Sequence, residues 1–254
     1  MGELVGARMA ERLRSAVKDP GPPPYGGLPV VLVSGAAHAP GADVARRFAA
    51  GGWRVALTDP DPVKIAAVLD EEGDGFITGG FELALAGDPA DAAGCRRVVD
   101  GTLDAMGRLD CLVHVVAAPA GALETLEPAT VNSVVAAGIC GPTFLTQAAV
   151  PYLEETFGSV VLVLQQAGDA LGAAVYAANV ALCRSWAAEL APRAVRVCSV
   201  AAGSGLVAAQ EGGVYDVTEL VWFLAQPQAA ALTGVQLDAG TGLAAGARAL
   251  LPTR

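Results

Sequence analysis

Short apolar runs alternate with longer segments of helical period along most of the chain from residue 28 onward. The runs are rich in Val and Leu and are nearly continuous, rather than alternating between apolar and polar positions. Such runs are typical of strands that are buried on both faces of a parallel sheet. The pattern predicts strands over residues 29–34, 53–58, 111–116, 159–164, 195–200 and 234–237.

The segments between these runs have the spacing of amphipathic helices. Examples cover residues 42–50, 92–106, 131–152 and 175–190. Strands that alternate with helices fold into an α/β domain with one doubly wound parallel sheet. The sequence therefore predicts a single domain of this class over residues 28–254, with no internal repeat and no second domain.

The beginning of the chain departs from this pattern. One face of a helix is predicted by four apolar residues at spacings of four, Val5, Met9, Leu13 and Val17. The Pro-rich segment 19–24 then ends that helix, because prolines remove backbone donors. We therefore expect residues 1–27 to form a short helical extension and a linker. The helix packs on the main domain, docks on a partner or frays at the surface.

Composition limits the functions open to the chain. Its 254 residues, 53% of them hydrophobic and 17% charged, suit one α/β domain. The net charge of −10 argues against nucleic acid as a partner, because phosphate binding needs clustered Lys and Arg. Lys18 and Lys64 are the only lysines, so no mechanism can use a lysine beyond residue 64. Five scattered cysteines and two histidines predict neither a disulfide framework nor a metal site.

The mean hydropathy of +0.47 is high for a soluble protein. The longest uncharged stretch nevertheless contains residues that disfavour a membrane span, namely Asn132, Pro142, Gln147 and Pro151. The first 18 residues mix charged with apolar positions, unlike a signal peptide. We therefore expect a cytoplasmic protein that does not enter a membrane.

Several short motifs follow one another along the chain. Residues 31–41 are Val-Leu-Val-Ser-Gly-Ala-Ala-His-Ala-Pro-Gly, and Asp59 ends the second predicted strand. Later motifs are Gly-Asp-Pro-Ala-Asp at 87–91, Tyr-Ala-Ala-Asn-Val-Ala-Leu at 176–182 and Leu-Thr-Gly-Val-Gln-Leu-Asp at 232–238. In this order and spacing they resemble the short-chain dehydrogenase/reductase family. The resemblance covers nearly the whole domain and implies a Rossmann-type fold.

The resemblance also implies a dinucleotide site. The family's TGxxxGxG turn, whose helix attracts the pyrophosphate, aligns with Ser34, Gly35, Ala39 and Gly41. Ala39 replaces the middle glycine, and its Cβ would crowd the phosphates. Asp59 aligns with the carboxylate that binds the adenosine ribose and favours NAD over NADP, although it also suits a helix-capping turn. Asp88 aligns with the adenine-side motif. The sequence leaves open whether NAD is bound.

The residues that the family uses for hydride transfer are mostly replaced. Tyr176 aligns with the general acid/base, but Val180 stands where the family has a lysine that lowers the pKa of that tyrosine. Gly138 aligns with an asparagine, and residues 160–184 contain no serine to orient a substrate carbonyl. Gln165 is the candidate for that orienting role.

Three functions fit these replacements. The first is a non-catalytic subunit, inactive alone, that pairs with an active family member or binds a small-molecule ligand. The second is an NAD-dependent oxidoreductase of alcohols or carbonyls that uses Tyr176. The third is a non-redox enzyme with Tyr176 and His114 as acid and base, since His114 lies near the carboxyl end of the fourth strand. The resemblance implies assembly as a homo- or hetero-oligomer through helices 131–152 and 175–190.

Overall fold

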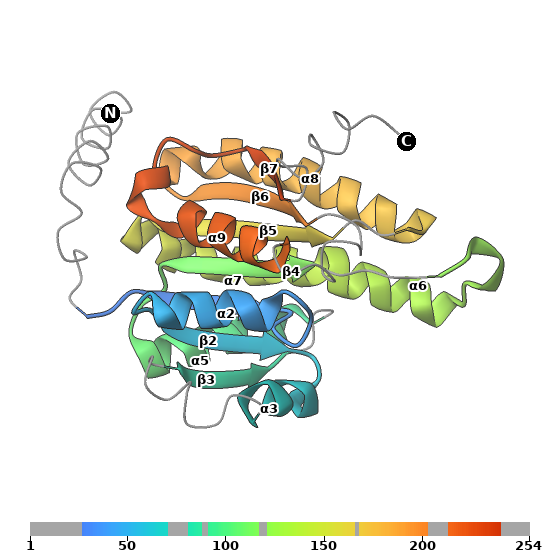
Figure 1. The fold of residues 1–254 in the computed structure, drawn as a ribbon, viewed down its shortest axis with the longest axis horizontal. Coiled ribbons are helices and arrows are strands. Elements are labelled where there is room, and N and C mark those ends of the chain that lie inside the picture. Colours follow the sequence, from blue (N-terminus) through green and yellow to red (C-terminus); the bar gives the residue numbers. More distant parts are fainter. Residues whose placement is uncertain are drawn as a thin grey trace, which may run out of the picture.

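In a computed structural model, the chain forms one seven-stranded sheet with helices on both faces (Figure 1). The structure describes residues 27–70, 81–87, 91–116, 121–165, 168–202 and 213–239. The strands are β1 Val30–Ser34, β2 Arg54–Asp59, β3 Phe81–Ala86, β4 Cys111–Val116, β5 Ser159–Gln165, β6 Arg196–Ala202 and β7 Gln236–Ala239. They are all parallel, in the order β3-β2-β1-β4-β5-β6-β7. The direction of winding therefore reverses between β1 and β4.

The helices are α2 Gly41–Ala50, α3 Pro62–Asp70, α5 Ala92–Met106, α6 Pro128–Val135, α7 Gly141–Thr156, α8 Ala170–Leu190 and α9 Gly213–Ala225. Aspartate side chains cap the start of three of them. Oδ1 of Asp61 accepts hydrogen bonds from the N–H groups of Val63 and Lys64 in the first turn of α3. The carboxylate of Asp91 accepts a hydrogen bond from the backbone of Ala93 at the start of α5, and Asp169 does the same for Gly172 of α8. The αL conformation of Gly107 ends α5.

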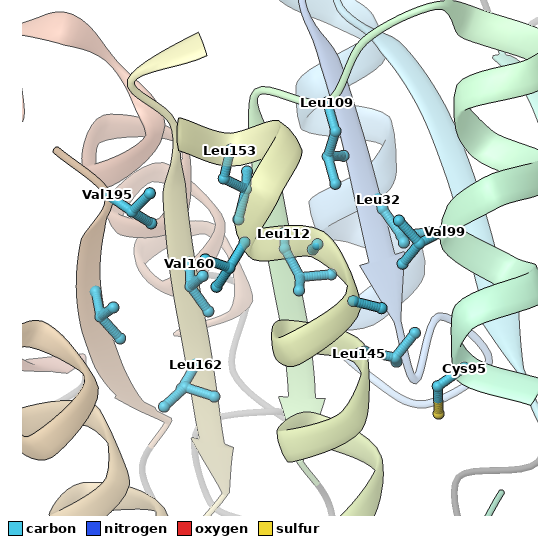
Figure 2. Packing of buried hydrophobic residues seen from close by; sticks show 14 of the residues in the cluster. Leu32, Cys95, Val99, Leu109, Leu112, Leu145, Leu153, Val160, Leu162 and Val195 are labelled. Carbon is cyan, nitrogen blue, oxygen red and sulfur yellow. The ribbon is translucent and has the colours of Figure 1, made fainter. Parts of the chain in front are cut away.

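The core consists of two hydrophobic clusters, one on each face of the sheet. Successive strand residues point to opposite faces. On β4, Leu112 therefore faces α5, α7 and α8, whereas Val113 faces α2 and α9. Figure 2 shows Leu145 and Leu153 of α7 directed at the strands from the first of these faces. This packing holds the carboxyl ends of the strands in fixed positions at one edge of the sheet.

A π-helical segment, η2 (Ala136–Cys140), joins α6 and α7 into one helix, Pro128–Thr156. By length and composition alone this helix is apolar enough to cross a membrane, with a hydropathy of 1.4 over its best window. Half of that window is buried inside the fold. The buried half packs against the sheet and α5.

The predicted fold class is confirmed, and each predicted strand is present with ends shifted by no more than two residues. The elements that were not predicted include the edge strand β3 and helix α3 that precedes it. Helix α8 begins at Ala170, five residues before the predicted start, because Asp169 caps it there. The proposed helical extension and linker fall almost wholly on residues 1–26, outside the described part of the chain.

Candidate functional site

The turn between β1 and α2 has no room for a side chain at two of its glycines. Gly35 has a φ of +72°, and a Cβ there would lie 2.4 Å from the carbonyl oxygen of Val115. A Cβ on Gly41 would lie 2.7 Å from the carbonyl oxygen of Gly35 and 2.8 Å from Cα of Ala36. The two glycines therefore allow the first residue of α2 to lie directly against the backbone of the turn.

The amino end of α2 has no side-chain cap. Pro40 occupies the N-cap position, and its side chain offers no acceptor to the first N–H groups of the helix. The N–H of Gly41 donates instead to the carbonyl oxygen of His38. Helix N-termini of this kind attract phosphate groups. Ser34 is the last residue of β1, and exposed Ala39 lies in the connection to α2. The residues predicted to contact a pyrophosphate therefore lie together in one short connection.

Asp59 ends β2 beside this connection and is only 2% exposed. Its Oδ1 accepts a hydrogen bond of 3.1 Å from the backbone N–H of Asp61. No group in the described ranges donates a hydrogen bond to Oδ2, and Nε2 of His38 lies 3.9 Å away. A buried carboxylate oxygen without a donor is costly, so it fits a site for a ligand hydroxyl. Asp88 lies outside the described residues.

Tyr176 points toward the far edge of the sheet. Its hydroxyl accepts a hydrogen bond of 2.7 Å from Nε2 of Gln236 on β7, and the same amide donates to Oδ1 of Asp238 at 3.2 Å. On β6, Ser199 pairs with Gln236 and Ala202 pairs with Gln165. Gln236 therefore lies three residues further from the carboxyl edge of the sheet than Gln165 does. Its backbone is roughly 10 Å below that edge.

Gln165 reaches in the opposite direction. It is the last residue of β5, and its Nε2 donates a hydrogen bond to the carbonyl oxygen of Ala39 in the β1–α2 connection. Because β4 lies between β1 and β5, this contact passes over the carboxyl end of β4. The partner of Gln165 thus lies beside β1, in the middle of the sheet, whereas the partner of Tyr176 lies on the edge strand β7.

His114 lies inside β4, two residues before the strand ends at Val116, and is 1% exposed. Its Nε2 lies 3.0 Å from Oγ1 of Thr146 on α7. Burial lowers the pKa of His114 to about 3, so the ring is neutral near pH 7. The interpretation of His114 as an acid or base finds no support in this placement, since the ring faces the core rather than the carboxyl edge.

Two polar side chains that the sequence left unassigned form contacts nearby. Asn179 of α8 is fully buried, and its Nδ2 donates hydrogen bonds to the carbonyl oxygens of Gly138 and Val175. Gln236 binds the hydroxyl of Tyr176. The bond from Asn179 to Gly138 and the bond from Gln236 to Tyr176 each join residues more than 40 positions apart in the chain. The spacing of residues in the sequence therefore could not predict them.

Metal and thiol chemistry receive no support from the described residues. No group of three or more His, Cys, Asp or Glu side chains there is arranged to hold a metal ion. The pKa values of two buried thiols are raised by desolvation, to about 12 for Cys111 and about 11 for Cys198. Such thiols stay protonated and are poor nucleophiles.

The fold and the β1–α2 connection define a Rossmann-type α/β protein. The reversal between β1 and β4, the two space-restricted glycines, the uncapped helix and the unpaired Asp59 oxygen all fit a dinucleotide with a ribose diol. Residues 29–211 match the family model for short chain dehydrogenases. The chain belongs to this family.

Known relatives agree with this assignment. Subunit BbsD of the hydroxy(phenyl)methylsuccinyl-CoA dehydrogenase from Thauera aromatica is 31% identical, over 68% of this chain and 72% of that protein. The 11-beta-hydroxysteroid dehydrogenase-like 2 of Arabidopsis thaliana is 26% identical, and the chain spans only 44% of it. A 3-ketoacyl-(acyl-carrier-protein) reductase from Brucella melitensis, complexed with NADH, is 26% identical with a TM-score of 0.71, over 83% of this chain and 96% of that one.

Proposed function

We propose that this chain is a dinucleotide-binding, non-catalytic subunit of a cytoplasmic short-chain dehydrogenase. One observation carries the proposal: the candidate catalytic side chains are held by separate partners, Tyr176 by Gln236, Gln165 by Ala39 and His114 by Thr146. An acid/base and an orienting group must converge on one substrate atom to catalyse hydride transfer. The absence of any lysine after Lys64 supports the same conclusion.

The dinucleotide in this proposal is NAD rather than NADP. The unpaired Oδ2 of Asp59 would accept a hydrogen bond from a ribose hydroxyl, and its negative charge would repel a 2′-phosphate. The amino end of α2 would hold the pyrophosphate. A bound nicotinamide supplies a hydride donor or acceptor. The chain's own residues form the binding site. The NADH complex of the Brucella melitensis reductase supports this class of ligand.

The partner in this proposal is an active family member that pairs with α7 and α8. Exposed alanines follow one face of α8, among them Ala173, Ala177 and Ala181. Small side chains allow a helix from another chain to approach closely. The Thauera aromatica relative is by name a subunit of a dehydrogenase, which supports a role of this kind. A second copy of this chain is the alternative occupant of the same helices.

One contact favours a second function, NAD-dependent conversion of an alcohol or carbonyl by Tyr176. Because Gln236 donates to the tyrosine oxygen, the hydroxyl hydrogen of Tyr176 is left for donation to a substrate. Asp238 accepts the other amide hydrogen and fixes the orientation of Gln236. In this alternative the amide of Gln236 takes over the support that a lysine gives in the family.

Thermal unfolding in the presence of each dinucleotide, followed by a turnover assay, tests the proposal. Saturating NADH at a hundred times its dissociation constant should stabilise the fold by about 2.7 kcal/mol, a shift of a few degrees, and NADPH should not. The isolated chain should show no carbonyl reduction, and co-expression with an intact family member should yield a stable complex. Turnover by the isolated chain that Tyr176→Phe abolishes would instead establish the second function.

A further inference from the structure

The hydrogen bond between Gln165 and Ala39 connects parts of the fold that flank the point where the sheet reverses its winding. Ala39 belongs to the connection that follows β1, and Gln165 ends β5. β4 lies between these strands in the order across the sheet. In open α/β sheets, ligands bind outside the carboxyl ends of the strands at this reversal. The contact therefore lies across the place where the fold binds ligands.

A bound dinucleotide would extend across the same region, from the β1–α2 connection toward the end of β5. The adenosine half would bind on the β1–β2 side, at Asp59 and the amino end of α2. The other half extends past the β1–α2 connection toward β4 and β5, since the reversal opens in that direction. The bond from Gln165 to Ala39 crosses the direction in which that half would extend.

The hydrogen bond between Gln165 and Ala39 can open without disturbing the core. Gln165 is half-buried at the end of its strand and Ala39 is exposed, so either group can exchange its partner for water or for a ligand. The turn itself is fixed by the close approach of Gly41 to Gly35, so the turn is not free to move out of the way. The movable part is the glutamine side chain.

We propose that Gln165 is a latch across the dinucleotide site, and that its hydrogen bond to Ala39 and a bound NAD or NADH exclude one another. The inference rests on the proposed function in one respect, that the chain binds a dinucleotide. It adds that the bond from Gln165 to Ala39 must open before a dinucleotide binds, and that this opening lowers the apparent affinity. A ligand that occupies only the adenosine side does not reach Gln165, so its affinity does not depend on the latch.

Calorimetric titrations with NADH and with AMP test the latch in the 254-residue chain. Gln165→Ala, and Gln165→Met as a variant that keeps the stem without the donor, should bind NADH about three- to tenfold more tightly than the wild type, the factor that one net hydrogen bond supplies. Their affinity for AMP should not change. Gln228→Ala is the control, because Gln228 is an exposed glutamine on the connection between α9 and β7, away from the site.

Weaker or unchanged binding of NADH by both Gln165 variants would overturn the latch while leaving the proposed function intact. An equal gain for NADH and AMP would overturn it as well, because AMP does not reach the contact. If neither the wild type nor any variant binds NADH, the proposed function fails and the latch fails with it.

Discussion

Nδ2 of Asn179 donates a hydrogen bond of 2.7 Å to the carbonyl oxygen of Gly138 and so joins α8 to the π-helical segment of the long helix. A π-turn alters the regular hydrogen-bond ladder, and such turns are frequent at functional sites. A Cβ at Gly138 would lie 2.5 Å from Cγ1 of Val175. The glycine thus permits the close approach of α8, and the asparagine of α8 faces the position where the family has its own asparagine.

Replacing Asn179 with alanine should lower the free energy of unfolding by about 1–3 kcal/mol, because the buried carbonyl of Gly138 loses its donor. Denaturant unfolding measures this loss. The matched control is Asn132→Ala, which removes an exposed amide from α6 and should stay within about 0.5 kcal/mol of the wild type. Equal effects of the two substitutions would show that the Asn179 bond contributes little.

Gly41→Ala should destabilise the fold by about 1–3 kcal/mol and weaken NADH binding, because the new Cβ would meet backbone atoms of the turn that cannot move aside as a side chain can. Gly168→Ala is the control, since a Cβ there meets nothing within 4 Å. Unfolding and NADH titration of both variants measure the difference. A Gly41→Ala protein with wild-type stability and affinity would contradict the close packing of α2 on the turn.

The strands were predictable because they are buried on both faces and therefore carry continuous Val and Leu runs. β3 escaped this criterion: its sequence, Phe-Glu-Leu-Ala-Leu-Ala, lies at the edge of the sheet and includes a charged residue. Helix α3 was given no bounds either, although Asp59 was seen to suit a helix-capping turn. The cap is Asp61, whose Oδ1 accepts hydrogen bonds from the N–H groups of Val63 and Lys64. Helix α8 was predicted too short because the alanines and glycine of its first turn show no amphipathic period.

The candidate site was predictable where its residues are local to one turn or strand end. Gly35, Gly41 and Asp59 lie where their motifs placed them, since those positions depend on the backbone near β1 and β2. The direction of a long side chain depends on distant partners instead. Tyr176 meets a glutamine 60 residues away and His114 a threonine 32 residues away, which no spacing in the sequence specifies.

Asp59→Asn should weaken NADH binding about ten- to a hundredfold, because hydrogen bonds to a charged group contribute about 1.5–3 kcal/mol. It should also narrow the preference for NADH over NADPH, since the repulsion of a 2′-phosphate is removed. Titration of both dinucleotides measures the two effects. Asp104→Asn is the control, because Asp104 is exposed near the carboxyl end of α5, on the face of the sheet opposite to α2. An unchanged NADH affinity in Asp59→Asn would exclude the carboxylate as the ribose ligand.

The stability of the protein should depend on His114 at acidic pH. Its pKa is about 3 in the folded chain because the ring is desolvated, whereas an exposed histidine titrates near 6.5. Between these pH values the unfolded chain binds a proton that the folded chain does not. The contribution is therefore fully present above about pH 6.5 and is lost as the pH falls toward 3, by up to about 1.4 kcal/mol per pH unit.

Denaturant unfolding from pH 7 to pH 4 isolates this contribution when wild type is compared with His114→Asn, which removes the titrating ring and keeps a polar group beside Thr146. The difference in unfolding free energy between the two proteins should shrink or reverse steadily toward pH 4, because only the wild type must keep a buried ring neutral. His38→Asn is the control, since His38 is the only other histidine and is exposed. If His114→Asn and the wild type follow parallel curves, the ring accepts a proton in the folded state, and His114 would have to reach water or an acid by a movement of β4 against α7.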